Sequence, residues 1–567
     1  MPVLCARFIL FMAMLGPVYG YAALPGGAEL QRLHDVLNVQ ESPAAVPDMP
    51  AILPPTPANA LTTVGEAASQ VKFTLNSVRI HGVTAYMPKK FLPLFAAATG
   101  QELTVAELAA LVDKITATYR NDGYILARAV LPPQDITAGN VEIQVVEGRL
   151  GAVKLEGDAA SSKLIQSYAK RLQNDAVLQA SSLERYLLLM NDLPGVTAKA
   201  TLVPGAQTGD SDIVITTNFV KTSGSYGASN WGTRYVGPQQ LEGDVTLNNA
   251  YTTRLGWHDS TTARIVQSPD ILNLTYMEIS HKLPVNAEGT TAEVRAHHSL
   301  SQPGWSLDDL NIKSETSGFA AKVSHPVVRS RASNLAMYAL FDWRDTATQT
   351  LSSELSNDHL RVLRTGFDVD HLNSFGGLSN INFEYSRGLG ALGANEKTDT
   401  DTSRGRGKAM GFSKFKLDLA YLQRLHQSWN LLLAASGQYS SHALLAGEEF
   451  GVGGENFGRG YDTSEITGDQ GLAAKAELQI NFPVGMAYLD SWQWFGFYDT
   501  GAVWQKDREP LESNGTVDIR STGMGIRTRL TDTLTADVTF AKPLTGGPQS
   551  SAGDDETNMY VRVRNRF

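Results

Sequence analysis

The sequence has almost no cysteine: Cys5 is the single one among 567 residues. It lies in front of a short apolar run, residues 8–18, which has Arg7 before it and small residues behind it. This is the layout of an export signal, so we expect a signal peptide over residues 1–22. Cleavage near Ala22 would leave a mature chain without cysteine, which excludes disulfides, thiolate chemistry and cysteine metal sites.

Long hydrophobic runs are missing as well. The run at 8–18 is shorter than the about 20 residues that a membrane-spanning helix needs. No later segment holds an apolar run of even about 18 residues. We therefore expect an exported protein, and any membrane span that it has must be made of strands.

Several kinds of functional signal are also absent. The 48 basic residues are outnumbered by 58 acidic ones, which argues against nucleic acid as a partner. The sequence has no GxSxG, HExxH or P-loop motif, and its eleven histidines are scattered. His297 and His298 are neighbours on a predicted strand, so their side chains point to opposite faces and make a poor metal site. The sequence predicts no catalytic residue, no metal and no cofactor, and we expect the chain not to be an enzyme.

The segment at residues 23–70 combines a short helix pattern with a proline-rich stretch. Leu30, Leu33 and Leu37 form one narrow stripe of a helix over residues 27–40. Six prolines follow by Asn59, which is typical of an extended linker. From composition alone this segment is a disordered terminus with a nascent helix or a tethered helix with a role of its own.

Two copies of one small α/β module follow, at residues 71–149 and 150–218, with the element order β-α-α-β-β. The first copy has predicted strands at 73–83, 124–131 and 140–147 and predicted helices at 89–98 and 104–120. The second has predicted strands at 152–156, 197–203 and 212–218 and predicted helices at 161–172 and 181–192. Thr104 and Glu107 form a capping-box pattern at the start of the second helix.

From residue 219 to residue 567 the pattern changes to strands only, with apolar and polar residues alternating over segments of about ten residues. A soluble β-sandwich has no place in its core for so many charged residues at strict alternation, so we predict a transmembrane β-barrel. The fold class is therefore α+β modules followed by a 16-stranded antiparallel barrel. The predicted strands lie near 219–231, 238–249, 253–265, 271–283, 290–300, 311–325, 333–345, 358–371, 376–388, 411–424, 428–440, 470–483, 492–504, 517–530, 533–543 and 557–567.

One predicted strand sets the faces of the barrel. If Asp499 faces the lumen, Trp494, Tyr498 and Trp504 face lipid. Ten residues separate the two tryptophans, and a strand tilted by about 40° places them roughly 25 Å apart in height, the expected spacing of aromatic girdles.

The stretch that organises the chain is a polar, glycine-rich loop at 441–471 between two predicted strands. Its centre is Gly458-Arg459-Gly460-Tyr461, a lone arginine between glycines that permit a tight tip. Taken alone, this is a hairpin loop with a solvated arginine.

Both halves of the chain resemble one family. The segments 121–150 and 190–215 are similar nearly throughout to the POTRA domains of TpsB transporters, which serve two-partner secretion in the haemolysin and filamentous-haemagglutinin class. The tetrad resembles the VRGY/F signature of TpsB transporters and of their BamA relatives, with Gly458 in place of the usual valine. Phe497, Asp499 and Gly501 match the family's FxDxG segment, and Phe567 resembles the last residue of an outer-membrane barrel.

The resemblance implies a location and a function. It implies an outer-membrane transporter that has periplasmic POTRA modules, a lumen-folded loop held by an Arg459–Asp499 pair, and a plug helix at 27–40. The expected partners are a secreted, β-rich exoprotein such as an adhesin or haemolysin, outer-membrane lipid, and the barrel assembly machinery, which reads Phe567. The alternatives are a BamA-like assembly factor, which usually has more POTRA modules, and a passive porin.

Overall fold

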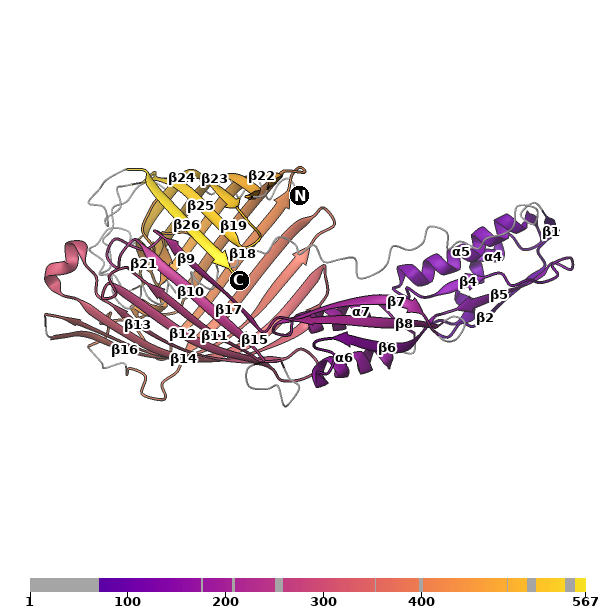
Figure 1. The fold of residues 1–567 in the computed structure, drawn as a ribbon, viewed down its shortest axis with the longest axis horizontal. Coiled ribbons are helices and arrows are strands. Elements are labelled where there is room, and N and C mark those ends of the chain that lie inside the picture. The colour runs from indigo at the N-terminus through magenta and orange to yellow at the C-terminus, as the bar shows by residue number, and fades with distance from the viewer. Residues whose placement is uncertain are drawn as a thin grey trace.

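A computed structural model describes residues 71–174, 177–205, 210–249, 258–351, 353–396, 401–486, 488–506, 516–545 and 556–567. The predicted signal peptide at 1–22 and the predicted helix and linker at 23–70 lie outside these residues. The described chain forms a closed barrel and an elongated arm of two α/β modules that projects from one end of it (Figure 1).

The first module differs locally from the prediction. The segment predicted as one strand at 73–83 is two short strands of different sheets, because the backbone N–H groups of Leu75 and Asn76 bond to the carbonyls of Gln101 and Gly139 and turn the chain between them. The predicted helix at 89–98 is a 3-10 turn and one helical turn. Its elements are β1 (Lys72–Thr74), β2 (Ser77–His81), η1 (Pro88–Lys90), α4 (Pro93–Ala96), β3 (Glu102–Thr104), α5 (Val105–Asn121), β4 (Arg128–Val130) and β5 (Asn140–Val146).

The second module repeats the sheet of the first. The strand orders are β2-β5-β4 and β6-β8-β7, and in each sheet the last strand is central and runs parallel to the first. The Thr104–Glu107 capping box at the start of α5 is confirmed. The elements of the second module are β6 (Arg149–Gly157), α6 (Lys163–Gln173), α7 (Ala180–Asn191), β7 (Val196–Pro204) and β8 (Asp210–Phe219). Among the described residues, no helix is both long and apolar enough to cross a membrane.

A buried carboxylate organises one end of the first module. Glu147, just after β5, accepts hydrogen bonds from the backbone N–H groups of Thr84 and Ala85 at 2.7 and 2.8 Å and from the hydroxyl of Tyr119 at 2.6 Å. The Thr84 hydroxyl also donates to it. Burial raises the pKa of Glu147, but these hydrogen bonds to the charged form outweigh burial and hold its pKa below the ordinary value.

The predicted 16-stranded antiparallel barrel is confirmed. Its strands follow one another in chain order round the closed sheet, and β9 pairs with β26 at the seam. The described strands are β9 (Thr222–Ser229), β10 (Gln240–Asn248), β11 (Ser260–Gln267), β12 (Leu274–Pro284), β13 (Thr291–Ser301), β14 (Lys313–Arg329), β15 (Ser333–Thr350), β16 (Ser353–Leu372), β17 (Gly377–Gly388), β18 (Ser413–Arg424), β19 (Trp429–Ser440), β22 (Gln470–Met486), β23 (Leu489–Trp504), β24 (Thr516–Arg529), β25 (Leu534–Pro543) and β26 (Asn558–Arg566).

The second module is docked on the barrel. Strand β8 leads into β9 after two residues. Arg329, at the end of β14, donates Nε and Nη2 to the carboxylate of Asp192, just after α7, at 2.8 and 2.6 Å. In the turn that follows β14, the N–H of Arg331 donates to Glu184 of α7. Arg171 pairs with Glu288, in the turn after β12, at 2.5 Å. The arm thus marks the near end of the barrel. The far end is where strands β9, β11, β13, β15, β17, β19, β23 and β25 end.

Candidate functional site

The lumen face of β23 carries the predicted partners of the loop arginine. Asp499, Phe495 and Phe497 are buried, whereas Trp494 and Tyr498 are 42 % and 37 % exposed on the other face. This alternation follows from the two-residue period of the strand. It places the acid and the two phenylalanines inside the barrel, and the two other aromatic residues outside.

The lumen loop, predicted at 441–471, consists of residues 441–469, because β22 already begins at Gln470. The tip of this loop lies against that face. Arg459 donates Nε to Asp499 Oδ2 at 2.9 Å and Nη2 to Oδ1 at 2.8 Å, a bidentate fork. The backbone N–H groups of Gly458 and Arg459 donate to the same carboxylate at 3.2 and 3.0 Å. Both side chains of the pair are almost fully buried.

Four further wall residues complete this tip anchor: Phe497, which the family resemblance predicted, and Glu477, Arg527 and Phe495, which were not predicted. Arg459 Nη1 donates to Glu477 Oε2 at 2.6 Å, and Arg527 donates to the other oxygen of Glu477 at 2.7 Å. The guanidinium of Arg459 lies 3.4 Å from the ring centre of Phe497, and that of Arg527 lies 3.8 Å from the ring centre of Phe495. Strand alternation already places Glu477 on the lumen face, and that was the available signal.

The two glycines of the tip are required for different reasons. Gly458 has φ = +91°, an angle at which a valine, the usual residue of the resembled signature, would be strained. Gly460 approaches the wall so closely that a β-carbon there would lie 2.7 Å from the backbone nitrogen of Pro543. The next residue, Tyr461, is buried and donates its hydroxyl to the backbone oxygen of Thr545.

Glycines of the wall receive apolar side chains of the loop. A β-carbon on Gly501 would lie 2.6 Å from Val452, and one on Gly471 would lie 2.1 Å from Phe450. Both apolar residues belong to β20 (Phe450–Val452), which pairs with β21 (Ile466–Gly468) in a short hairpin inside the loop. Because Gly501 has no side chain, it leaves the space that Val452 of the hairpin occupies.

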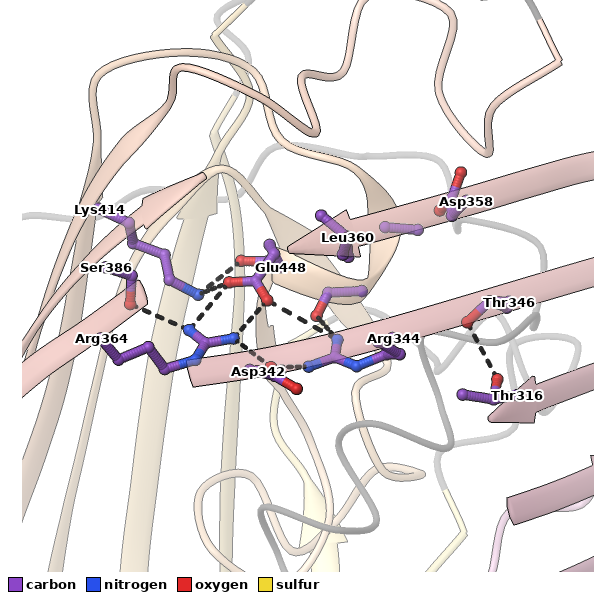
Figure 2. Close-up of polar contacts among 12 residues, drawn as sticks. Thr316, Asp342, Arg344, Thr346, Asp358, Leu360, Arg364, Ser386, Lys414 and Glu448 are labelled. Carbon is purple, nitrogen blue, oxygen red and sulfur yellow. Dashed lines mark hydrogen bonds and ion pairs between the residues drawn. The ribbon is translucent and has the colours of Figure 1, made fainter. Parts of the chain in front are cut away.

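A second anchor, which the sequence analysis also missed, holds the base of the loop to a different part of the wall. Glu448 ends η3 (Ala446–Glu448) and is buried among three cations. Arg364 donates to its two oxygens at 2.6 and 3.2 Å, Lys414 donates at 2.6 Å, and Arg344 lies 3.7 Å away. Asp342 bridges the two arginines at 2.6 and 2.9 Å (Figure 2). The cations come from β15, β16 and β18.

Two further ion pairs extend the attachment. Arg404, in the loop between β17 and β18, donates to Asp469 at 2.6 Å. Arg562 on β26 donates both Nη groups to Glu455 at 2.8 and 2.6 Å. In strand order the lumen loop is thus attached from β15 round to β26, more than half of the barrel, and it crosses the lumen instead of lining one wall.

Phe567, the predicted assembly signal, lies at the seam. Its backbone exchanges two hydrogen bonds with Gly224, at 3.0 and 3.1 Å, and thereby extends the β9–β26 ladder by one position. Its ring is 58 % exposed and lies 6.5 Å from that of Tyr226. The structure keeps it apart from the tip anchor.

The chemistry of the site is electrostatic. In the part of the chain that the structure describes, no group of three or more His, Cys, Asp or Glu is arranged to hold a metal ion. The two anchors join buried carboxylates to guanidinium and ammonium groups, an arrangement that can fix or release a loop.

Family comparison decides the class of protein. Residues 209–528, more than half of the chain, match the family model described as haemolysin secretion/activation protein ShlB/FhaC/HecB. The chain belongs to this family. Residues 73–148 match the ShlB-type POTRA domain. The chain is therefore a TpsB transporter of the outer membrane, with periplasmic POTRA domains, and translocates an exoprotein in two-partner secretion.

The individual relatives are distant in sequence, but the similarity covers most of each chain. The heme/hemopexin transporter protein HuxB of Haemophilus influenzae strain 86-028NP is 24 % identical over 453 residues, 78 % of this chain and 79 % of that protein. The outer membrane transporter CdiB of Dickeya dadantii strain 3937 is 25 % identical and covers 72 % of each chain. The structure of CdiB from Escherichia coli has the same fold, with a TM-score of 0.74, 22 % identity, and coverage of 97 % of this chain and all of that one.

Proposed function

We propose that the POTRA pair captures an unfolded, β-rich exoprotein in the periplasm and that the exoprotein then crosses the barrel lumen while the lumen loop is displaced. The observation that carries this proposal is the double anchoring of the loop across the lumen, at Arg459 and at Glu448. A loop that crosses the channel must move before a chain can pass. The chain has no P-loop, so we assign the driving force to folding of the exoprotein outside the cell.

Exposed sheet edges support capture by strand addition. β7 is an outer strand of its sheet and is nine residues long. Asn191 bonds the N–H and C=O of Ala198 on its free side, so by alternation the polar groups of Ala200 and Leu202 point outward too. Backbone pairing along such an edge binds many sequences without a full side-chain code.

The remaining partner assignments are also part of the proposal. The exposed aromatic and aliphatic side chains of the barrel wall, such as Trp494 and Tyr498, meet outer-membrane lipid. Phe567 ends the strand that closes the seam, which is where an assembly factor must act last, and we propose that it is read by the barrel assembly machinery. Residues 27–40 would plug the pore, and their deletion should raise the conductance of the protein in planar bilayers while secretion continues.

The cargo is identified by comparing proteins in the culture medium of the source bacterium with and without this chain. We expect one large protein to disappear from the medium while the set of outer-membrane proteins stays unchanged. Loss of many outer-membrane proteins instead would indicate an assembly factor.

The capture step is tested by Ala200→Pro, which removes an outward N–H of β7 without breaking a bond to β8. Cargo should then accumulate in the periplasm. Ala200→Thr, which keeps the N–H, is the matched control and should secrete normally. Equal secretion by both variants would contradict capture at this edge.

A further inference from the structure

Strand β16 extends well beyond its neighbour β17 at the far end of the barrel, opposite the arm, which we call the outer end. Its pairing with β15 continues to Ser353, but its pairing with β17 stops at Val362, opposite Gly388. Residues 353–361 therefore present one side to no strand of the barrel, over about 30 Å at 3.3 Å per residue. An unpaired strand edge is a template for another chain.

A loop covers this edge and forms hydrogen bonds with the backbone groups of β16 that no strand pairs. We define the edge cover as residues 389–396 and 401–404. The N–H of Leu389 donates to the carbonyl of Arg361 at 2.8 Å, and the carbonyl of Asp401 accepts from the N–H of Asn357 at 2.6 Å. The two β16 residues in these bonds, Asn357 and Arg361, both have odd numbers, as expected for backbone groups on one side of a strand.

Between these two bonds, Asn395 imitates a paired strand. Its N–H donates to the carbonyl of His359 at 3.1 Å, and its side-chain oxygen accepts from the N–H of the same residue at 2.5 Å. Its side-chain N–H donates to the carbonyl of Asn357 at 3.1 Å. One residue thus satisfies three backbone groups of the edge without forming a strand, and a real strand can replace all three bonds.

The edge cover is attached to the lumen loop as well as to β16. Ser403 donates its hydroxyl to Asp358 of β16 at 2.5 Å and accepts from the N–H of Ala446 in the lumen loop at 3.1 Å. Arg404 donates to the carbonyl of Leu444 at 2.8 Å, also in the lumen loop. Displacement of the lumen loop therefore pulls on the cover.

We propose that the upper edge of β16 is a docking site for the secreted exoprotein, which forms its first extracellular strand there after the lumen loop withdraws the edge cover. This inference rests on the proposed function, because it requires an exoprotein in the lumen. Three observations select this occupant: the edge lies at the end where a translocated chain emerges, its cover is tied to the element that passage must move, and it offers backbone pairing, which suits a β-rich chain of any sequence.

The first test fixes the cover in place. Cysteines at Asp358 and Ser403, whose side chains are in contact, are joined by a short bis-methanethiosulfonate linker in a chain without other cysteines after residue 5. Joining them should abolish secretion of the cargo identified above, and reduction should restore it. The unjoined double variant is the control. Normal secretion by the joined protein would overturn the proposal.

The second test asks where the cargo docks. A photoreactive amino acid replaces Leu355, 46 % exposed on the β16 edge, or Trp305, 52 % exposed on another loop of the outer end. Cargo is arrested in transit by a tightly folding domain fused to its C-terminus. It should crosslink to position 355 and not to position 305. Crosslinking at 305 alone, between two copies of the transporter, or at neither position would refute docking on β16.

The same experiments separate the two proposals. If the culture medium contains the same proteins whether or not the bacterium makes this transporter, the transport proposal fails before any crosslink is made. If cargo is secreted and Leu355→Asp, which keeps the backbone edge, secretes it normally while the joined protein is blocked, then pairing is through the backbone, as proposed. Loss of secretion in Leu355→Asp, with a normal barrel, would show that a side-chain contact carries the binding and would overturn strand pairing.

Discussion

Replacing Arg459 with alanine should release the tip of the lumen loop while the barrel still assembles. The substitution removes three charge-assisted hydrogen bonds, two to Asp499 and one to Glu477, and the contact with the ring of Phe497. Removing one partner of a buried ion pair costs about 3–5 kcal/mol. At about 1.4 kcal/mol per power of ten, the docked tip loses roughly two to four powers of ten in population.

The barrel should tolerate this loss because its ladder does not depend on the arginine. β22 and β23 pair from Gln470 to Met486, and Glu477 keeps its bonds from Arg527. Asp499 is inaccessible while the tip is docked, and it regains water when the tip leaves. The free-energy cost therefore falls on the position of the loop.

The assay is cargo in the medium, with heat-modifiable barrel in outer membranes as the measure of assembly and protease cleavage at residues 458–461 as the measure of tip release. Arg459→Ala should expose the cleavage site. It should also stop secretion, because the loop must return to its docked position after each displacement and the variant cannot hold it there. Arg459→Lys should restore secretion only in part, because lysine cannot make the planar fork. Arg529→Ala, which breaks an exposed 3.6 Å pair with Asp490, is the matched control and should cost under about 1 kcal/mol. Normal secretion by Arg459→Ala, or loss of its barrel, would refute the anchoring role.

Three further changes test other parts of the structure. Glu448→Gln should detach the base of the loop, because three buried cations lose their shared carboxylate, and secretion should fall even though the tip anchor is intact; protease sensitivity at 446–449 is the measurement, and an unchanged loop would contradict the second anchor. Gly501→Val should displace the β20–β21 hairpin and lower secretion, and Val452→Ala in the same chain should restore it by making room for the new side chain; no rescue would mean that the valine acts through the wall itself. Because the pKa of Glu147 is lowered in the folded chain, its stabilisation is complete above the unfolded value of about 4.3 and is lost as pH falls through the folded value. Hydrogen-exchange protection of the amides of Thr84 and Ala85 should therefore drop in acid, and Glu147→Gln should be insensitive to the same change.

Alternation and turn chemistry carried most of the fold prediction. The period of two identified every barrel strand, and the repeated element order identified both small modules. Three barrel strands differ from the prediction by five residues or more at one end. β11 begins at Ser260 rather than at 253. β15 ends at Thr350 rather than at 345, and β16 begins at Ser353 rather than at 358, because both strands rise above the lipid there and need no apolar face. The break between β1 and β2 was missed, because backbone bonds to residues far along the chain create it.

The candidate site was only partly predictable. The family resemblance predicted the Arg459–Asp499 pair, and the two-residue period of the strand predicted which face Asp499 lies on. Alternation gives the face of a side chain but neither its height nor its partner, so Glu477 and the cations around Glu448 could not be assigned. Arg344 lies 103 positions before the residue of the loop whose carbonyl it contacts, and no local pattern records such a distance.

The kind of contact that holds the lumen loop suits an element that must leave and return. Buried ion pairs contribute little net stability, since water solvates both partners once they separate, but they fix geometry strictly. An apolar plug of the same size would expose its surface in the path of an unfolded, β-rich chain and would bind it. In this chain the loop combines its ionic anchors with two small apolar clusters. Leu444 and Leu445 pack near the base, and Phe450, Val452 and Tyr461 pack against the wall towards the tip. Release of the loop therefore separates two networks of ion pairs, which water then solvates, and two small apolar clusters, rather than one continuous apolar face.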